Sequence, residues 1–131
     1  MTRPDWDLYF IRIAKEIASR STCPRAMVGA VIVKNNRILA TGYNGAPAGK
    51  PHCSEVGCNV VNDHCTTAVH AETNAIAQAA KYGVSVEGAT VYYWDSKGRY
   101  AQNIVELKSH CYPCGLLVES AGIVRVCGRG V

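Results

Sequence analysis

The spacing of apolar residues indicates a helix near the start of the chain. Residues 4–21 carry large apolar side chains three or four positions apart, which is the spacing of one helical face: Trp6, Tyr9, Phe10, Ile13 and Ile17. This pattern predicts an amphipathic helix, with Pro4 near its first turn.

Two β-rich runs follow, separated by a polar pair. Residues 28–33 and 38–43 are rich in small and β-branched side chains, and Asn35 and Asn36 lie between them. Asparagine tolerates the positive φ that a tight turn requires. We therefore expect a β-hairpin over residues 28–43.

Helix-like and strand-like segments alternate in the second half of the chain. We expect helices over 69–82 and 112–121 and strands over 88–94 and 123–127. Gly83 and Gly122 are placed to end the two helices, and Pro113 is tolerated in the first turn of the second. This alternation favours an α/β sandwich with one mixed sheet.

Two segments show no clear periodic spacing of apolar residues. Residues 44–65 are rich in glycine, proline and asparagine and contain three cysteines and two histidines, so we expect a loop that something other than a core holds in place. Residues 95–108 form a polar connector.

Composition narrows the class of protein. A chain of 131 residues that is 48% hydrophobic can form one domain, 1–131, with a real core. No stretch of 18 or more apolar residues exists and the start lacks a signal-like apolar run, so we expect no membrane span and a cytoplasmic location. The net charge of +4 suits an anionic substrate or simply an ordinary surface, and without a basic run nucleic acid is not an expected partner.

The candidate chemistry lies at the starts of the two later helices. His70 and Glu72 begin one helix, and Cys111 and Cys114 begin the other. Helix N-termini favour thiolates, and one histidine with two cysteines leaves a fourth zinc position open for water. Each motif alone is weak, because a C-x-x-C pair also fits a redox site or half a zinc ribbon. Together they match the H-x-E…C-x-x-C signature of zinc nucleobase deaminases.

Longer stretches extend this match. The chain resembles the deoxycytidylate deaminase family, of the cytidine deaminase fold, in "RSTCPRAMVGAVIV", "ILATGYNGAPAG", "PHCSEVGC", "HAETNAI" and "CYPCGLLVESAGI". The resemblance implies a three-layer α-β-α sandwich and the zinc-dependent hydrolysis of deoxycytidine monophosphate (dCMP) to deoxyuridine monophosphate (dUMP) and ammonia. It implies that His70, Cys111 and Cys114 bind the catalytic zinc. Glu72 would carry a proton from the metal-bound water to N3 and then to the leaving amine.

The resemblance also implies substrate contacts. Asn44 would contact the sugar or phosphate, and the backbone around Ala71 and Val28 would line the base pocket. For the phosphate, the residues alone offer several cations, and we expect Arg25 because it lies beside the loop before the first strand. The other candidates are Lys50, Lys81 and Arg99.

A second, structural zinc is expected on the remaining cysteines. The resemblance places Cys23 and Cys53 among its ligands, and Cys58 with Cys65 would complete a closed four-sulfur site. His52 or His64 could replace one sulfur, and a set of ordinary thiols is the alternative. We expect Cys127, in the last strand, to be a small core residue.

Three features depart from the family pattern. His110 stands where the family has proline before the first paired cysteine, and the 95–108 connector is an insertion near the expected substrate pocket. The chain ends at Val131, soon after the last strand, which would leave a flank of the sheet exposed and favours a homo-oligomer. The alternatives therefore stay open: a deaminase of another nucleotide, a nucleoside or an RNA base, or a non-catalytic zinc module, which would have no use for Glu72.

Overall fold

The computed structural model describes residues 2–23, 26–46, 49–58, 60–61, 64–65, 70–97, 105–106 and 112–130. In chain order the elements are α1 (Trp6–Ala18), β1 (Val28–Lys34), β2 (Arg37–Tyr43), α2 (Cys53–Val56), β3 (Val60–Val61), β4 (His64–Cys65), α3 (Ala71–Lys81), β5 (Thr90–Asp95), β6 (Val105–Glu106), α4 (Tyr112–Ser120) and β7 (Arg125–Gly130). None of the described helices is long and apolar enough to cross a membrane.

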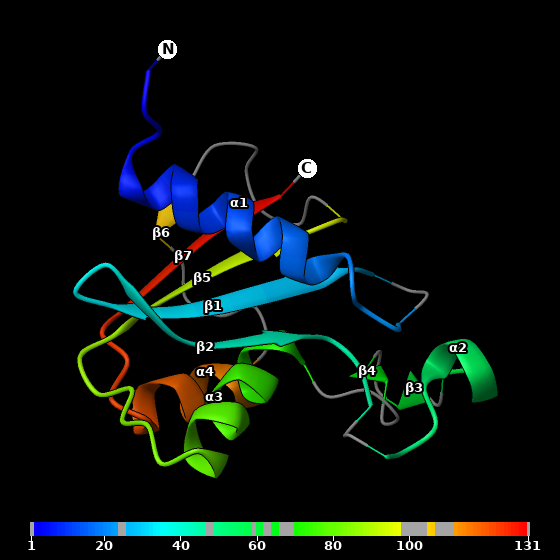
Figure 1. Cartoon of the computed structure of the whole chain (residues 1–131). Coiled ribbons are helices and arrows are strands. Elements are labelled where there is room, and N and C mark those ends of the chain that lie inside the picture. Colours follow the sequence, from blue (N-terminus) through cyan, green and yellow to red (C-terminus); the bar gives the residue numbers. More distant parts are fainter. Residues whose placement is uncertain are drawn as a thin grey trace.

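The central sheet is mixed. Its strands lie in the order β2-β1-β5-β7-β6, with β5 and β7 parallel and the other neighbours antiparallel. Helix α1 covers one face, and α3 and α4 cover the other (Figure 1). The expected three-layer α-β-α sandwich is confirmed.

The hairpin forms where the asparagine pair predicts it. Strands β1 and β2 pair from Lys34 and Arg37 outward, and Asn35 and Asn36 have φ of 53° and 59°. Both turn residues are thus in the left-handed region, as a two-residue hairpin turn requires.

Two expectations about irregular segments need correction. The 44–65 segment is not only loop, because it contains the short helix α2 and a two-stranded sheet of β3 and β4. The 95–108 connector supplies β6, which pairs with β7 at Val105–Gly128 and Glu106–Cys127. The connector thereby covers part of the flank of β7 that we expected to be exposed. Strands of two residues are too short to show a period in sequence.

The crossover from β5 through α4 to β7 fixes the direction of α4. Gly88 N–H donates to the Gly122 carbonyl (2.8 Å), and Val124 N–H donates to the Ala89 carbonyl (3.0 Å). These bonds hold the end of α4 beside the start of β5. The start of α4 therefore lies at the opposite side of the sheet, at the edge formed by the carboxyl ends of β2 and β5.

Two glycines allow the helices to approach the sheet closely. A Cβ added to Gly42 in β2 would lie 2.5 Å from the Ala71 carbonyl oxygen and 2.5 Å from the Ala75 nitrogen, both in α3. A Cβ on Gly29 in β1 would lie 2.0 Å from the Ala14 carbonyl oxygen in α1. The first turn of α3 thus lies on the end of β2, at the same edge where β5 ends.

The core has one part on each face of the sheet. The α1 face is aromatic and aliphatic, with Phe10, Ile11, Val31 and Tyr92 in contact, and it includes the fully buried Cys127, as expected. The other face buries mainly alanine and valine beneath α3 and α4, together with Tyr93.

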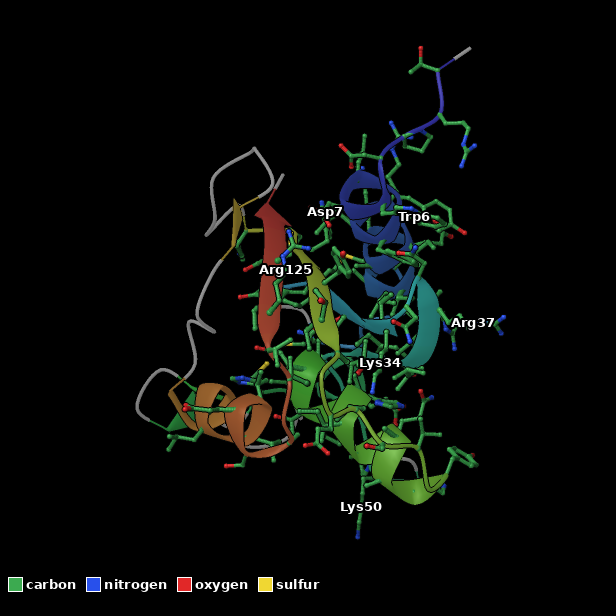
Figure 2. All side chains as sticks on the ribbon, turned by 90° about the vertical axis from the view of Figure 1, so that its left-hand side faces the viewer. Trp6, Asp7, Lys34, Arg37, Lys50 and Arg125 are labelled. Carbon is green, nitrogen blue, oxygen red and sulfur yellow. The ribbon has the colours of Figure 1, made fainter. Side chains whose placement is uncertain are left out.

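A polar network joins the two ends of the chain on the α1 face. The Arg125 guanidinium donates to both carboxylate oxygens of Asp7 (2.9 and 2.8 Å), and Tyr92 Oη donates to Asp7 Oδ1 (2.7 Å). Figure 2 shows Asp7 and Arg125 side by side. The hydrogen bond from Arg125 lowers the pKa of Asp7, whereas burial, with the bond to Asp7, raises the pKa of Tyr92.

Replacing Asp7 by Asn is expected to lower the free energy of unfolding by about 1 kcal/mol at pH 7, a modest cost because solvent screens a partly exposed pair. Since the pKa of Asp7 is lowered by folding, its contribution is present above the unfolded-state pKa and is lost as pH falls through the folded-state pKa. The difference between wild type and Asp7→Asn in urea unfolding should therefore shrink below about pH 4. Glu16→Gln, at an exposed position of α1, is the control. A difference that stays constant with pH would contradict the ion-pair interpretation.

Candidate active site

The start of α3 carries two of the residues expected at the metal. His70 is the N-cap residue, in an extended backbone conformation (φ −65°, ψ 153°), and its side chain makes no capping hydrogen bond to the helix. Glu72 lies in the first turn and is only 2% exposed. The positive end of the helix dipole favours a carboxylate at this position.

The start of α4 carries one of the paired cysteines. Cys114 lies in the first turn of α4, whereas Cys111 is outside the described residues. Helices α3 and α4 contact each other, and both begin at the edge where β5 ends. The backbone thus brings His70, Glu72 and Cys114 to one edge of the sheet. An imidazole and two thiolates are a donor set that suits zinc.

The residues expected to contact the substrate, Val28, Asn44 and Ala71, lie at this same edge. Val28 begins β1, and its N–H donates to Asn44 Oδ1 (2.9 Å). Asn44 follows β2 directly and is 8% exposed, and Ala71 begins α3 and is 1% exposed. Asn44, Val28 and Ala71 therefore lie at the ends of three elements that contact one another, β2, β1 and α3, and α3 also carries Glu72. Arg25, expected at the phosphate, is outside the described residues.

Asn44 is held firmly by its surroundings. Its Oδ1 accepts from Val28 N–H and contacts the Ser21 hydroxyl, and its Nδ2 donates to the Ala26 carbonyl (2.7 Å). Its own backbone N–H donates to the Val28 carbonyl (3.2 Å). The side chain thus joins the end of β2 to the segment that leads into β1.

Two further polar residues at this edge were not expected from the sequence. Asn74 Nδ2 donates to the Tyr43 carbonyl (2.7 Å), which links α3 to the residue before Asn44. Asp95, the last residue of β5, is fully buried, pairs in register with Val28, and accepts from Lys97 N–H (2.9 Å). The only sequence signal for Asn74 is its place one helical turn after His70, among alanines.

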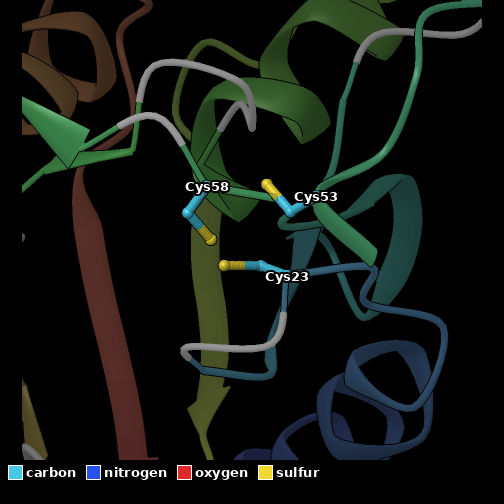
Figure 3. A group of neighbouring side chains, drawn as sticks. All are labelled: Cys23, Cys53 and Cys58. Carbon is cyan, nitrogen blue, oxygen red and sulfur yellow. The ribbon is translucent and has the colours of Figure 1, made fainter. Parts of the chain in front are cut away.

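Three of the remaining cysteines come together. The sulfur atoms of Cys23, Cys53 and Cys58 all lie within 4.8 Å of one another (Figure 3). Sulfur atoms around a tetrahedral zinc are about 3.8 Å apart, as Zn–S bonds of about 2.3 Å require. The group thus fits one metal ion with small shifts. The backbone of Cys65 lies in β4, but its side chain is not described.

His52 is not part of this cysteine group. Its Nδ1 lies 3.1 Å from Thr22 Oγ1, and it precedes α2 as the N-cap residue. His52 thus supports the segment next to Cys23 through Thr22. The side chain of His64, the other alternative ligand, is not described.

Comparison with known families gives a match over nearly the whole chain. Residues 4–127 match the sequence model of the cytidine and deoxycytidylate deaminase zinc-binding region. The chain belongs to this family.

Individual relatives agree with this membership. The chain is 39% identical to the deoxycytidylate deaminase of Mycobacterium phage D29, over 96% of this chain and 95% of that protein. It is 49% identical to ComE operon protein 2 of Bacillus subtilis, over 70% of this chain but only 49% of that protein. The crystal structure of the cyanophage S-TIM5 dCMP deaminase in complex with dCMP and dUMP has a TM-score of 0.75 and 28% identity, covering 99% of this chain and 85% of that one.

Proposed function

We propose that this chain is a zinc-dependent hydrolase that converts dCMP to dUMP and ammonia, and that residues 1–131 form one deaminase domain. The observation that carries the proposal is the arrangement of His70 and buried Glu72 at the start of α3, in a fold that matches a dCMP- and dUMP-bound deaminase over nearly its full length. The sequence identity to a phage deoxycytidylate deaminase over 95% of that protein supports the same substrate.

His70, Cys111 and Cys114 would hold the catalytic zinc. The support is the donor set and the position of His70 and Cys114 at two helix starts on one sheet edge, where the helix dipoles favour thiolate ligands. Zinc held by these residues would lower the pKa of a bound water toward about 7, and so would supply the nucleophile for C4 of cytosine.

Glu72 moves the protons. Its carboxylate is the acceptor for the proton released when the nucleophile forms, and the same carboxyl then donates to N3 of the base. The carboxylate of Glu72 then takes the remaining proton, from the hydroxyl group added at C4, and gives it to the 4-amino group, which leaves as ammonia while the C4 carbonyl forms. The near-complete burial of Glu72 supports this role, because a carboxyl shielded from bulk water exchanges its proton with the bound base rather than with solvent.

The proposed substrate contacts have distinct chemistry. Backbone at Val28 and Ala71 lines the base pocket, and Arg25 binds the phosphate. Asn44 contacts the sugar or phosphate as a donor: its Oδ1 and one amide hydrogen are committed to described neighbours, which leaves the second amide hydrogen for substrate.

The substrate assignment is tested by measuring ammonia release with the zinc-loaded protein. The panel comprises dCMP, deoxycytidine, cytidine monophosphate, deoxycytidine triphosphate, adenosine monophosphate and a short cytosine-containing RNA. We expect the highest kcat/KM with dCMP. Turnover of another panel member in preference to dCMP, or of none, would refute the assignment.

Glu72→Ala is expected to retain the catalytic zinc and to lose roughly 10²–10⁴-fold in kcat, because proton transfer then falls to water. Steady-state kinetics with dCMP and metal analysis of the same samples measure the two quantities. Glu119→Gln, at an exposed position of α4, is the matched control and should keep wild-type kcat. Near-normal activity in Glu72→Ala would remove Glu72 from the mechanism.

We further propose a second, structural zinc bound by Cys23, Cys53, Cys58 and Cys65. Its support is the convergence of the first three sulfur atoms within 4.8 Å in a segment rich in glycine and proline. A metal there would fasten α2 to the segment before β1, in place of the hydrophobic core that the 44–65 segment cannot form for itself.

Metal analysis of protein purified without chelators is expected to find about two zinc ions per chain, and about one in Cys53→Ser. Cys127→Ala, which alters a cysteine buried in the core on the α1 face, is the matched control and should still bind two. A wild type that binds about one zinc, or a Cys53→Ser variant that loses none, would refute the second site.

The setting of the protein is also a proposal. A reducing, cytoplasmic location suits cysteines that serve as metal ligands. Association into a homo-oligomer would cover the apolar side chains of Leu116 and Leu117, which α4 leaves 48% and 37% exposed.

A further inference from the structure

A side chain of α3 forms a hydrogen bond to the end of β2, directly before Asn44, the proposed nucleotide contact. Asn74 lies one turn after His70, and its Nδ2 donates to the Tyr43 carbonyl over 2.7 Å in a partly buried setting. Tyr43 is the last residue of β2, and Asn44 follows it directly. This side chain-to-backbone hydrogen bond is therefore one of the contacts that set the distance from the start of α3 to Asn44.

The neighbouring contacts do not fix this distance by themselves. Gly42 lies against the backbone of Ala71 and Ala75, a contact that limits how close β2 can come to α3. Packing of this kind has no direction along the strand, whereas a hydrogen bond specifies both a distance and an angle. Asn44 is fastened on its other side, through Val28 and Ala26, to the segment before β1.

We propose that Asn74 is a positioning residue: by holding the Tyr43 carbonyl it sets Asn44 at the right distance from His70 and Glu72. The inference rests on the proposed deaminase function, in which Asn44 contacts the nucleotide. Without the bond, the end of β2 moves relative to His70 and Glu72, while both of these stay in place at the start of α3. The affinity for nucleotide falls, and the chemistry at C4 is largely retained.

The same helix provides a matched control. Gln78 lies one turn after Asn74, and its Oε1 accepts from Thr41 N–H over 2.8 Å. This bond also joins α3 to the backbone of β2, but two residues further from Asn44 and on an exposed part of the helix. A bond that served only to attach α3 to β2 would have equal effects at either position.

The test compares Asn74→Ala with Gln78→Ala in the zinc-loaded protein. Asn74→Ala is expected to raise KM for dCMP about tenfold, with kcat changed less than about threefold, because small displacements of binding groups weaken the oriented complex. The Kd for dUMP, measured by calorimetry, should rise by the same factor. Gln78→Ala should leave KM, kcat and Kd within about twofold of the wild type. Both variants should retain wild-type zinc content and a cooperative thermal transition.

A double-mutant cycle tests whether Asn74 acts through Asn44. In an Asn44→Ala background, Asn74→Ala should raise KM little further, since the group that it positions has gone. Equal KM changes in the two single variants, a fall in kcat with KM unchanged, or full additivity in the cycle would each overturn the inference. A wild type that does not deaminate dCMP refutes the proposed function instead, and the comparison of Asn74→Ala with Gln78→Ala is then made on the panel substrate that it prefers.

Discussion

The absence of a side chain at position 42 is the constraint on which the site depends. With glycine there, the carbonyl oxygen of Ala71 and the nitrogen of Ala75 lie only 2.5 Å from the position that a Cβ would occupy, so the first turn of α3 rests directly on the end of β2. The side chain of any larger residue would clash with backbone atoms, and these cannot move away as the end of a flexible side chain can. The proposed metal ligand and the proposed proton carrier are therefore held close to the strand that leads to Asn44.

The sheet topology brings the other half of the site to the same edge. Strands β2 and β5 both run antiparallel to β1, so they end together where β1 begins. The crossover from β5 to β7 runs through α4, on the face of the sheet that α3 also covers. Because backbone hydrogen bonds hold the end of α4 beside the start of β5, the start of α4 lies beside the end of β5. Two helix N-termini thus meet at the carboxyl ends of parallel strands, which is where open α/β sheets commonly bind ligands.

Features that depend on local chemistry could be predicted from the sequence. The turn at Asn35 and Asn36, the two later helices, and the placement of His70 and Glu72 at a helix start all follow from backbone preferences of a few residues. Features that depend on distant partners could not. The bond between Arg125 and Asp7 joins residues 118 positions apart, and nothing in either neighbourhood indicates the other. Strand β6 likewise forms by pairing with β7. A strand of two residues is too short to show a periodic pattern in the sequence.

Contacts between residues distant in sequence, which could not be predicted, also occur inside the candidate site. Three consecutive residues, 21–23, make several of them. Ser21 contacts Asn44, Thr22 contacts His52 and donates its N–H to the Asn44 carbonyl (3.3 Å), and Cys23 belongs to the cysteine group. Because consecutive residues cannot move independently, whatever fixes the sulfur of Cys23 also restricts the hydroxyl that supports Asn44. Residues 21–23 therefore link the cysteine group to Asn44, the proposed nucleotide contact. The proposed structural zinc would thereby favour nucleotide binding, because it would reduce the conformations open to residues 21–23 before the nucleotide binds.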